Sequence, residues 1–549
     1  MTEHSNLNEW DRRELLKALL GSAFVGLSSG CRVPTPNFSG ELLAPDFSFG
    51  HRLRDGFQPT VNTEDWRDVN CVIVGGGIAG LSAAWRLQEA GVSDFVVLEI
   101  EDKPGGTALS GEVGEFRFPW GAHYVPTPMA ENRALIHLFD QMGIVESLSV
   151  DGDPQIKEEF LCRDPEERLF VNGEWIAGLY PSSIATDEDW RQLAEFRAEI
   201  DRWVEARDEQ GRRMFAIPMS AGSDTPEVVS LDQISMADWM SQHGWTSAPL
   251  RWLVDYACRD DYGLTIEQTS AWAGVFYFAS RIRRPGDESQ PVITWPEGNG
   301  RIVDFLVSRV ADSILCRHAV CGIAADSDNS GAGVTAFDLA SEKAIGFRTP
   351  HVIFAAPQFL APHLIDGFVE ARNVTPFQYG SWLVANVHLR DRPQNSGFSM
   401  CWDNVIYDSK SLGYVVSTHQ TGADHGPTVV TWYYPFAVAD PDISRQQLLE
   451  LDWEHWSEVA LSDLEIAHPD IRSLVTRIDC MRWGHAMVQP RPGFVWSDAR
   501  RLAAKPFRSI HFAGTDLSGI ALMEEAFFHG VRSAEEVMQK QEIAFDSIL

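Results

Sequence analysis

The chain reads CVIVGGGIAG at residues 71–80. The first four of these residues are apolar and mostly β-branched, as in a buried strand, and residues 81–90 continue with a helical pattern that stops at a glycine. A strand, a glycine turn and a helix in this order predict a dinucleotide-binding unit. Gly75 allows the tight turn, Gly77 lets a pyrophosphate approach the helix N-terminus, and Gly80 lets the helix pack closely on the strand.

A second apolar strand supports this prediction. Residues 95–98 read FVVL and are followed by Glu99, about 24 residues after the glycine turn, where a carboxylate can accept hydrogen bonds from a ribose. Ile78 and Ala79 complete the turn and are predicted to line the same cofactor site. A GxGxxG pattern alone is a weak signal, and the second strand with its terminal acid makes it a strong one.

Further segments decide between FAD and NAD as the cofactor. They are GGT at 105–107, WGAHY at 120–124, GNGR at 298–301, VIFAAP at 352–357, IHFAGTD at 510–516 and MEEAFFHG at 523–530. With these segments the chain resembles the flavin-containing amine oxidoreductases, which include monoamine and polyamine oxidases, L-amino-acid oxidases and the related desaturases. The resemblance runs from about residue 70 to residue 540. It implies FAD as the cofactor.

The resemblance also implies which residues contact FAD. The segment containing Gly121, Ala122 and His123 would pass close to the isoalloxazine, and Val320 would lie near the adenine. Asp516 would hydrogen-bond ribityl or pyrophosphate oxygens. The other residues that the resemblance assigns to FAD are Gly105, Gly106, Thr107, Gly514, Met523, Glu524 and Ala526. The last three would begin a helix whose N-terminal amides point at the flavin.

The domain organisation follows from the same resemblance. The expected fold class is α/β, with a discontinuous Rossmann-like FAD-binding domain and an inserted α+β substrate domain. The FAD-binding domain is expected at 68–128, 285–370 and 481–549, and the substrate domain at 129–284 and 371–480.

The chain departs from the family pattern where amine oxidation would take place. The family commonly carries a lysine that holds a water at flavin N5, but the strand around residues 384–387 has none, and Asn386 is its nearest polar substitute. The aromatic cage positions fall at residues 483–487 and Leu522 without a tyrosine pair, and Thr107 stands where an arginine is common. These departures weaken the prediction of an amine as the substrate.

Five residues are the candidates for catalysis. His123 and Tyr124 are expected to line the site, as proton acceptors or as groups that orient the substrate. Trp483 is expected at the cage, Asn386 in place of the lysine, and His485 facing the flavin or the substrate. A structural role, in a hydrogen bond or in packing at a domain seam, is the alternative for each histidine and for Tyr124.

The N-terminal segment reads as an export signal. Arg12 and Arg13 precede an apolar stretch at residues 18–30 that is too short to span a bilayer, a pattern that resembles a bacterial twin-arginine signal over residues 1–31. The expected location is therefore periplasmic or extracellular. Cys31 follows a lipoprotein-like box, so a lipid anchor and a soluble periplasmic form both stay open. Residues 32–67 read as a linker or an arm lying over the domain.

The charge balance excludes some partners. With 45 basic and 78 acidic residues the net charge is -33. This much negative charge repels phosphate backbones and anionic bilayers, so we expect no nucleic-acid partner and no membrane contact except through a lipid at Cys31. The acidity could attract cationic substrates, or it could be a solvated surface suited to salt. The eight cysteines form no CxxC pair, so neither a zinc site nor a disulfide framework is indicated.

The sequence thus predicts an exported FAD-dependent oxidoreductase. It would oxidise an amine or a related small substrate by hydride transfer to the flavin and pass the electrons to oxygen or a quinone. Two alternatives stay open: an FAD-dependent desaturase or dehydrogenase of an apolar substrate, and a flavoprotein without catalytic activity.

Overall fold

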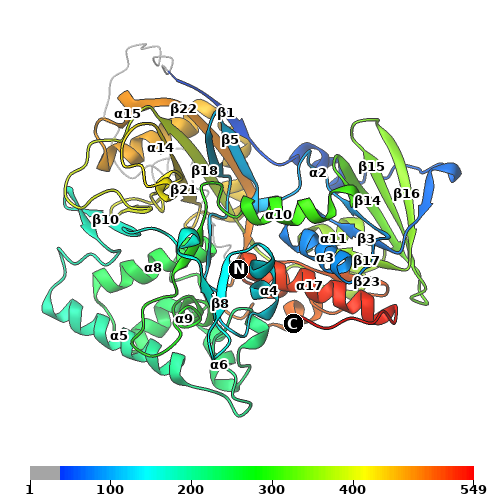
Figure 1. Cartoon of the computed structure of the whole chain (residues 1–549), viewed down its shortest axis with the longest axis horizontal. Coiled ribbons are helices and arrows are strands. Elements are labelled where there is room, and N and C mark those ends of the chain that lie inside the picture. Colours follow the sequence, from blue (N-terminus) through cyan, green and yellow to red (C-terminus); the bar gives the residue numbers. More distant parts are fainter. Residues whose placement is uncertain (1–37) are drawn as a thin grey trace, which may run out of the picture. The chain divides into compact units, whose positions relative to one another are not determined.

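The computed structural model describes residues 38–549 (Figure 1). The predicted export signal, Cys31 and the first part of the predicted arm lie outside these residues and stay predictions. Within the described residues, no helix combines the length and the apolarity that crossing a membrane requires.

A five-stranded parallel sheet confirms the predicted α/β fold. Strands β3 and β4 are buried at every position, as their unbroken apolar runs require when both faces of a parallel sheet are covered, here by helices on one face and by a smaller sheet on the other. The strand order is β13-β4-β3-β17-β23. The strands are β3 (Cys71–Val74), β4 (Phe95–Leu98), β13 (Ile314–Leu315), β17 (His351–Phe354) and β23 (Ile510–Phe512).

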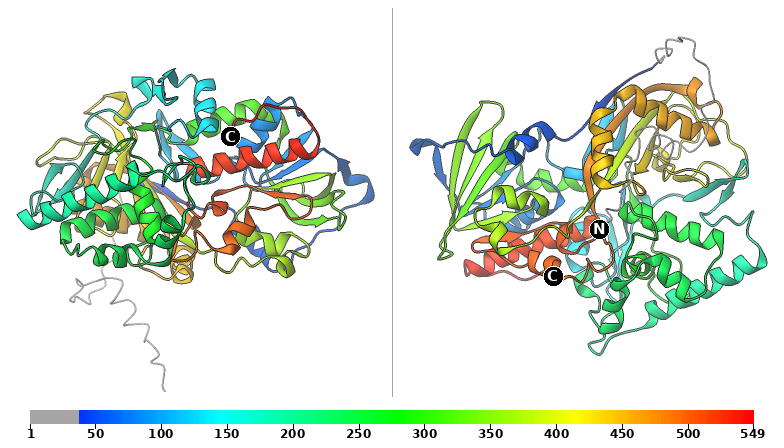
Figure 2. Two further views of the ribbon diagram at one scale, coloured as in Figure 1. Left: turned by 90° about the horizontal axis from the view of Figure 1, so that it is seen from below. Right: turned by 180° about the vertical axis from the view of Figure 1, so that it is seen from behind.

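The glycine turn joins β3 to helix α3 (Ile78–Glu89). Gly75 has φ +100°, a value that side chains rarely adopt, and a Cβ on Gly80 would stand 1.9 Å from the Gly75 carbonyl oxygen. Helix α17 (Met523–Lys540) runs along α3 in Figures 1 and 2. A Cβ on Gly530 would stand 2.2 Å from the Ala79 carbonyl oxygen, so only glycine permits this approach. The two close packings fix the N-terminus of α3 at the end of β3.

A smaller antiparallel sheet, which β2 joins in parallel, lies beside the five-stranded one. Its order is β14-β15-β16-β2. The strands are β14 (His318–Ala325), β15 (Ala332–Asp338), β16 (Lys343–Thr349) and β2 (Trp66–Asp68). The helices around the two sheets, besides α3 and α17, are α10 (Gly300–Val310), α11 (Ala361–Leu364), α12 (Phe368–Ala371) and α16 (Asp498–Ala503).

An eight-stranded mixed sheet joins both parts of the predicted substrate domain. Its order is β1-β22-β18-β21-β20-β19-β10-β11. The strands are β1 (Ser39–Leu43), β10 (Glu167–Val171), β11 (Glu174–Ala177), β18 (Tyr379–Leu389), β19 (Asp403–Ile406), β20 (Tyr414–Val416), β21 (Thr428–Pro435) and β22 (Val475–Val488). Helices α13 (Pro441–Glu450), α14 (Trp453–Ala467) and α15 (Ile471–Leu474) follow β21 in the chain. The arm contributes β1, which pairs in parallel with β22, and the expected boundary after residue 480 falls inside β22.

Five helices form the C-terminal part of the first insertion, after β11. They are α5 (Asp187–Glu205), α6 (Pro226–Ser230), α7 (Met236–Gln242), α8 (Ala248–Tyr262) and α9 (Ala271–Ala279). Helix α5 begins with a capping box in which Thr186 and Asp189 exchange hydrogen bonds. Its apolar stripe of Leu193, Phe196, Ile200 and Trp203 is buried in a core shared with α7, α8 and α9.

The remaining elements connect these parts. They are α2 (Phe47–Arg54), α4 (Arg133–Gln141), β5 (Ser110–Val113), β6 (Phe116–Pro119), β7 (Tyr124–Pro126), β8 (Val145–Leu148), β9 (Pro154–Ile156) and β12 (Val292–Thr294). Strand β7 pairs with β12 and begins at Tyr124, so this short ribbon fixes the end of the segment expected near the isoalloxazine.

Candidate active site

A cavity lies where the N-terminus of α17, the segment before β7, helix α8 and strands β18 and β22 come together. It encloses about 970 Å³, part of it open to solvent, which is enough for a flavin ring and a small substrate. The cavity collects eight residues that the sequence analysis singled out: Thr107, Gly121, Ala122, His123, Tyr124, Trp483, Met523 and Glu524.

Three chain segments stack against one another at one wall of this cavity. The Gly105 N–H donates to the Gly76 carbonyl oxygen at 2.8 Å, and the Ala122 N–H donates to the Thr107 carbonyl oxygen at 3.1 Å. A Cβ on Gly121 would stand 2.2 Å from that same Thr107 oxygen, so glycine is required there. The glycine turn, the 105–107 turn and the segment before β7 therefore form one continuous surface.

This surface fits the phosphates and ribose of a dinucleotide. Helix α3 has no side-chain cap at Gly77, and a Cβ on Gly77 would meet nothing nearer than the Gly106 Cα at 3.9 Å. An uncapped helix N-terminus beside open space is suited to a pyrophosphate. Glu99 stands at the end of β4, where its carboxylate accepts the Gly76 N–H at 2.6 Å, and its burial raises its pKa.

The C-terminal cofactor residues form a second part of the same wall. Helix α17 also starts without a side-chain cap, at Leu522, and Met523 and Glu524 of its first turn line the cavity. Gly514 precedes Asp516, whose carboxylate accepts the Gln358 N–H at 2.7 Å and the Tyr379 hydroxyl at 2.5 Å. Asp516 therefore links the segment that follows β17 to the start of β18 through these two hydrogen bonds. A contact with the flavin cofactor stays a prediction.

Not every residue predicted to contact FAD lines the cavity: the glycine turn, with Ile78 and Ala79 buried at the start of α3, lies outside the lining, and so do Val320 and Ala526. Val320 is buried in the core between the two sheets of the FAD side, and Ala526 is buried one turn into α17. They belong to the structure around the cofactor wall rather than to the cavity lining.

Aromatic side chains form another wall. The His123 ring stacks on Tyr433 at 4.8 Å between centroids, and the Tyr433 hydroxyl donates to the Gly121 carbonyl oxygen at 3.0 Å. Trp483 is fixed by its indole N–H, which donates to the Trp120 carbonyl oxygen at 2.7 Å, and Trp382 completes the wall. Tyr433 was not among the residues predicted for the site.

The shifted pKa values of His123 and Tyr124 limit their ability to exchange protons with a substrate. Burial lowers the pKa of His123 to about 3 and raises the pKa of Tyr124 well above 10. The imidazole is therefore neutral and weakly basic, and the phenol stays protonated at neutral pH. Both residues are better suited to orienting a substrate than to accepting a proton from it.

Acidic residues from α8 and α17 also reach the cavity. Asp260 and Asp261 end α8, Glu524 begins α17, and Arg281 is the basic residue among them. Asp261 is 4% exposed and accepts a hydrogen bond from Arg281 at 2.6 Å. Sequence analysis missed all of these except Glu524. The available signal was a pair of acids on the apolar side of a helix, after Val254 and Ala257.

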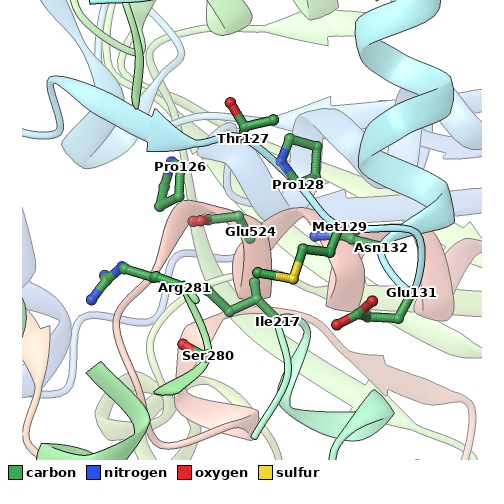
Figure 3. Close-up of a pocket in the computed structure, with 10 residues that line it drawn as sticks. All are labelled: Pro126, Thr127, Pro128, Met129, Glu131, Asn132, Ile217, Ser280, Arg281 and Glu524. Atoms are coloured by element: carbon green, nitrogen blue, oxygen red, sulfur yellow. The ribbon is translucent and has the colours of Figure 1, made fainter. Parts of the chain in front are cut away.

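A smaller cavity of about 300 Å³ adjoins the larger one. Pro126, Arg281 and Glu524 line both cavities. In Figure 3, Glu524 extends from α17 into the space between Pro126 and Arg281. The three residues thus form the partition between the two spaces.

Two catalytic predictions need correction. Asn386 is fully buried below the cavity, where its amide donates to the Pro119 carbonyl oxygen at 3.0 Å and accepts from the Thr431 hydroxyl at 2.7 Å. Val384, two residues earlier on the same face of β18, lines the cavity instead. His485 is exposed and stacks on Phe359 at 4.3 Å between centroids, outside the cavity lining.

A β-bulge explains the position of His485. Gly380 of β18 pairs with Met487, and Trp382 pairs with Trp483. Two steps along β18 therefore match four steps along β22, so the extra residues of β22 turn away from the regular face. Trp483 and Met487 keep their place in the cavity, whereas His485 leaves it.

The buried Glu525 makes stability depend on pH. Glu525 is 1% exposed, accepts the Met219 N–H at 2.6 Å, and has its pKa raised by burial to about 7 from 4.5. The folded state retains a proton that the unfolded chain releases, so this group's contribution is present below pH 4.5 and is lost as pH rises through 7. The shift corresponds to about 3 kcal/mol. We expect Glu525→Gln to narrow the stability difference between pH 5 and pH 8 by about this amount in thermal denaturation.

The matched control is Glu542→Gln, at an exposed position just past the end of α17. In Glu542→Gln the difference in stability between pH 5 and pH 8 should equal that of the unmodified protein. An unchanged difference in Glu525→Gln itself would show that Glu525 is ionised in the folded state throughout this range.

Comparison with known proteins identifies the family of the chain. The model of the flavin containing amine oxidoreductase family matches residues 78–538. A probable flavin-containing monoamine oxidase A of Dictyostelium discoideum is 21% identical over 499 residues, which cover 85% of this chain and 97% of that protein. Wild-type putrescine oxidase bound to putrescine superposes with a TM-score of 0.61 at 17% identity, covering 86% of this chain and 100% of that one.

The same fold also occurs in a fatty acid isomerase from P. acnes that produces CLA. Its structure superposes with a TM-score of 0.61 at 14% identity, covering 86% of this chain and 98% of that one. The fold alone therefore leaves the substrate open. The family match extends over most of the chain, so the chain belongs to the flavin-containing amine oxidoreductases and is an FAD-dependent oxidoreductase.

Proposed function

We propose that the protein is an exported amine oxidase that passes the electrons of a small amine to oxygen. The observation that carries this proposal is the charge of the cavity. Three carboxyl groups, those of Asp260, Asp261 and Glu524, share the lining with a single guanidinium, that of Arg281. A buried excess of carboxylates favours a cationic ligand and disfavours a fatty acid, whose own carboxylate it would repel.

The apolar and aromatic part of the lining suits the reacting end of an amine. When bound, FAD accepts two electrons as a hydride from the carbon next to the nitrogen. The nitrogen must be uncharged, because its lone pair assists release of the hydride from the neighbouring carbon. The walls formed by Trp382, Val384 and Trp483 exclude water around this nitrogen. Trp483 cannot rotate freely because its N–H is held by the Trp120 carbonyl oxygen.

His123 contributes to this environment by staying neutral. An imidazole with a pKa of about 3 adds no positive charge that would repel the substrate. Its ring is held by Tyr433, Tyr124 and Trp402 at centroid distances of 4.8, 5.0 and 5.4 Å, and it lines the cavity. Val384 lines the cavity from the strand on which the family resemblance led us to expect a lysine, so the oxidation has to proceed without an ammonium group from this part of the strand.

Anaerobic reduction of the purified holoprotein tests the proposal. We expect a member of a panel of monoamines, diamines, polyamines and amino acids to bleach the flavin absorbance band, and we expect oxygen to restore it with formation of hydrogen peroxide. A flavin that dithionite reduces but no amine reduces would contradict the proposal. If a quinone but not oxygen restores the flavin absorbance of the reduced enzyme, the electron acceptor is a quinone and not oxygen.

Export rests on the pattern of Arg12, Arg13 and the apolar stretch after them. Fractionation of cells that produce the chain with and without residues 1–31 tests it, because only the longer chain should reach the periplasm or the medium.

A further inference from the structure

The charges in the cavity exceed what oxidation of a simple monoamine needs. Arg281 is already paired, since it donates to Asp261 at 2.6 Å and to the Tyr277 carbonyl oxygen at 3.0 Å. Within residues 38–549 neither Asp260 nor Glu524 forms an ion pair with a side chain. Glu524 is only 4% exposed. Two carboxyl groups are thus held in a largely buried cavity without a cationic partner.

Unpaired carboxylates in such a place are costly. Burial raises the pKa of both Asp260 and Glu524, and the nearby Arg281 offsets this increase only in part. The Asp261–Arg281 pair lines the same cavity as Asp260 and Glu524. A ligand ammonium placed among these residues would compensate one of the two carboxylates and would replace the water lost on burial.

The reacting nitrogen is a poor candidate for that ammonium. Hydride release requires the nitrogen lone pair, and a carboxylate beside this nitrogen would favour its protonated form. Asp260 also comes from α8, a helix of the substrate side, whereas the turns and α17 that form the cofactor wall come from the FAD side. A carboxylate on α8 is therefore available to a second charged group while the first amine lies among the aromatic residues.

We propose that Asp260, together with Glu524, forms a recognition site for a second cationic group of the substrate, so that the enzyme prefers diamines to monoamines of equal length. This inference rests on the proposed amine oxidation. It assigns Asp260 to substrate specificity and leaves the hydride transfer to the flavin.

The test compares Asp260→Asn with the unmodified holoenzyme on 1,4-diaminobutane and butylamine, and on 1,5-diaminopentane and pentylamine. We expect kcat/KM for the diamines to fall about 100-fold, because truncating one partner of a buried charge pair typically has an effect of this order. The values for the monoamines should change less than about threefold. Asp260→Glu keeps the charge on a longer side chain and should shift the preference toward the shorter diamine.

Asp255→Asn is the matched control. Asp255 lies on the same helix, pairs with Arg259 at 2.9 Å and does not line the cavity, so its loss should leave the ratio of diamine to monoamine unchanged. If Asp260→Asn retains full FAD content and its kcat/KM falls equally for diamines and monoamines, Asp260 acts on the reacting nitrogen and the inference is overturned. No loss with either class would overturn it as well.

A binding experiment separates this inference from the proposed function. If no amine reduces the unmodified enzyme, the proposed oxidation has failed. Binding of the non-oxidisable dication 1,4-bis(trimethylammonio)butane, followed by tryptophan fluorescence because Trp382 and Trp483 line the cavity, then still tests the cation site. Binding that weakens at least tenfold in Asp260→Asn supports the site, and equal binding by both proteins overturns it.

Discussion

Replacing Gly77 by valine is expected to weaken FAD binding strongly and to leave the fold intact. Gly77 has φ -73° and ψ -178°, an extended conformation that valine adopts readily. Its Cβ would meet no protein atom nearer than 3.9 Å, so the protein itself does not require glycine there. The requirement would come from the pyrophosphate that approaches the N-terminus of α3.

The expected loss of FAD affinity is on the order of 1000-fold. A side chain at this position overlaps the phosphates and interrupts their hydrogen bonds to backbone N–H groups, each of which is worth about 1.5–3 kcal/mol when one partner is charged. Titration of apoprotein with FAD measures the affinity. Circular dichroism and thermal denaturation, compared with unmodified apoprotein, measure the fold.

Two other glycines give the controls. Gly50 lies in α2, where a Cβ would have no neighbour within 4 Å. The variant Gly50→Val should therefore keep normal FAD affinity. Gly80→Val should damage the fold itself, because its Cβ would stand 1.9 Å from the Gly75 carbonyl oxygen. Full FAD content in Gly77→Val would mean that the cofactor phosphates do not approach this turn.

The cofactor wall was predictable because its signals are local. The residues of the glycine turn are neighbours in the chain, and an apolar strand before them and a helix after them leave one geometry for the turn. The 105–107 turn and the start of α17 were found by resemblance to a family in which these segments recur.

The cavity was less predictable because several distant segments form it. Trp382, Val384 and Asn386 alternate onto one face of β18, and a sequence shows this face but not how far along the strand the cavity extends. The prediction of Asn386 thus identified the correct face and a position two residues too far along it. His485 was misplaced because the bulge between Trp483 and Met487 leaves no sequence signal.

The carboxylates in the cavity change what the acidity of the chain implies. A net charge of -33 is typical of a solvated acidic surface, and most of the acids among residues 38–549 are not buried. Asp260 and Asp261 belong to α8, and nothing in their own segment shows that this helix end meets α17, more than 250 residues later. Only the fold brings Asp261, Arg281 and Glu524 to one place.

Replacing Arg281 by methionine is expected to destabilise the protein by about 3–5 kcal/mol at pH 8. Arg281 is 6% exposed and Asp261 is 4% exposed, so the substitution leaves a buried carboxylate without its partner. Methionine keeps most of the packing of the side-chain stem against the Tyr277 ring, over which the guanidinium lies at 4.3 Å. The loss should therefore report mainly on the charge.

The double variant Asp261→Asn, Arg281→Met distinguishes charge from packing. Because it removes both charges, we expect it to recover more than half of the loss, as measured by the apparent free energy of unfolding in urea. Lowering the pH to 5.5 should also reduce the loss of stability in Arg281→Met, because the Asp261 carboxylate then becomes protonated. Burial already raises the pKa of Asp261, and loss of Arg281 raises it further. Arg284→Met, which removes an exposed pair with Asp151 at 3.4 Å, should cost less than about 1 kcal/mol. If the double variant is no more stable than the single one, the pair contributes packing rather than charge balance, and the argument for an unpaired negative charge next to it loses its basis.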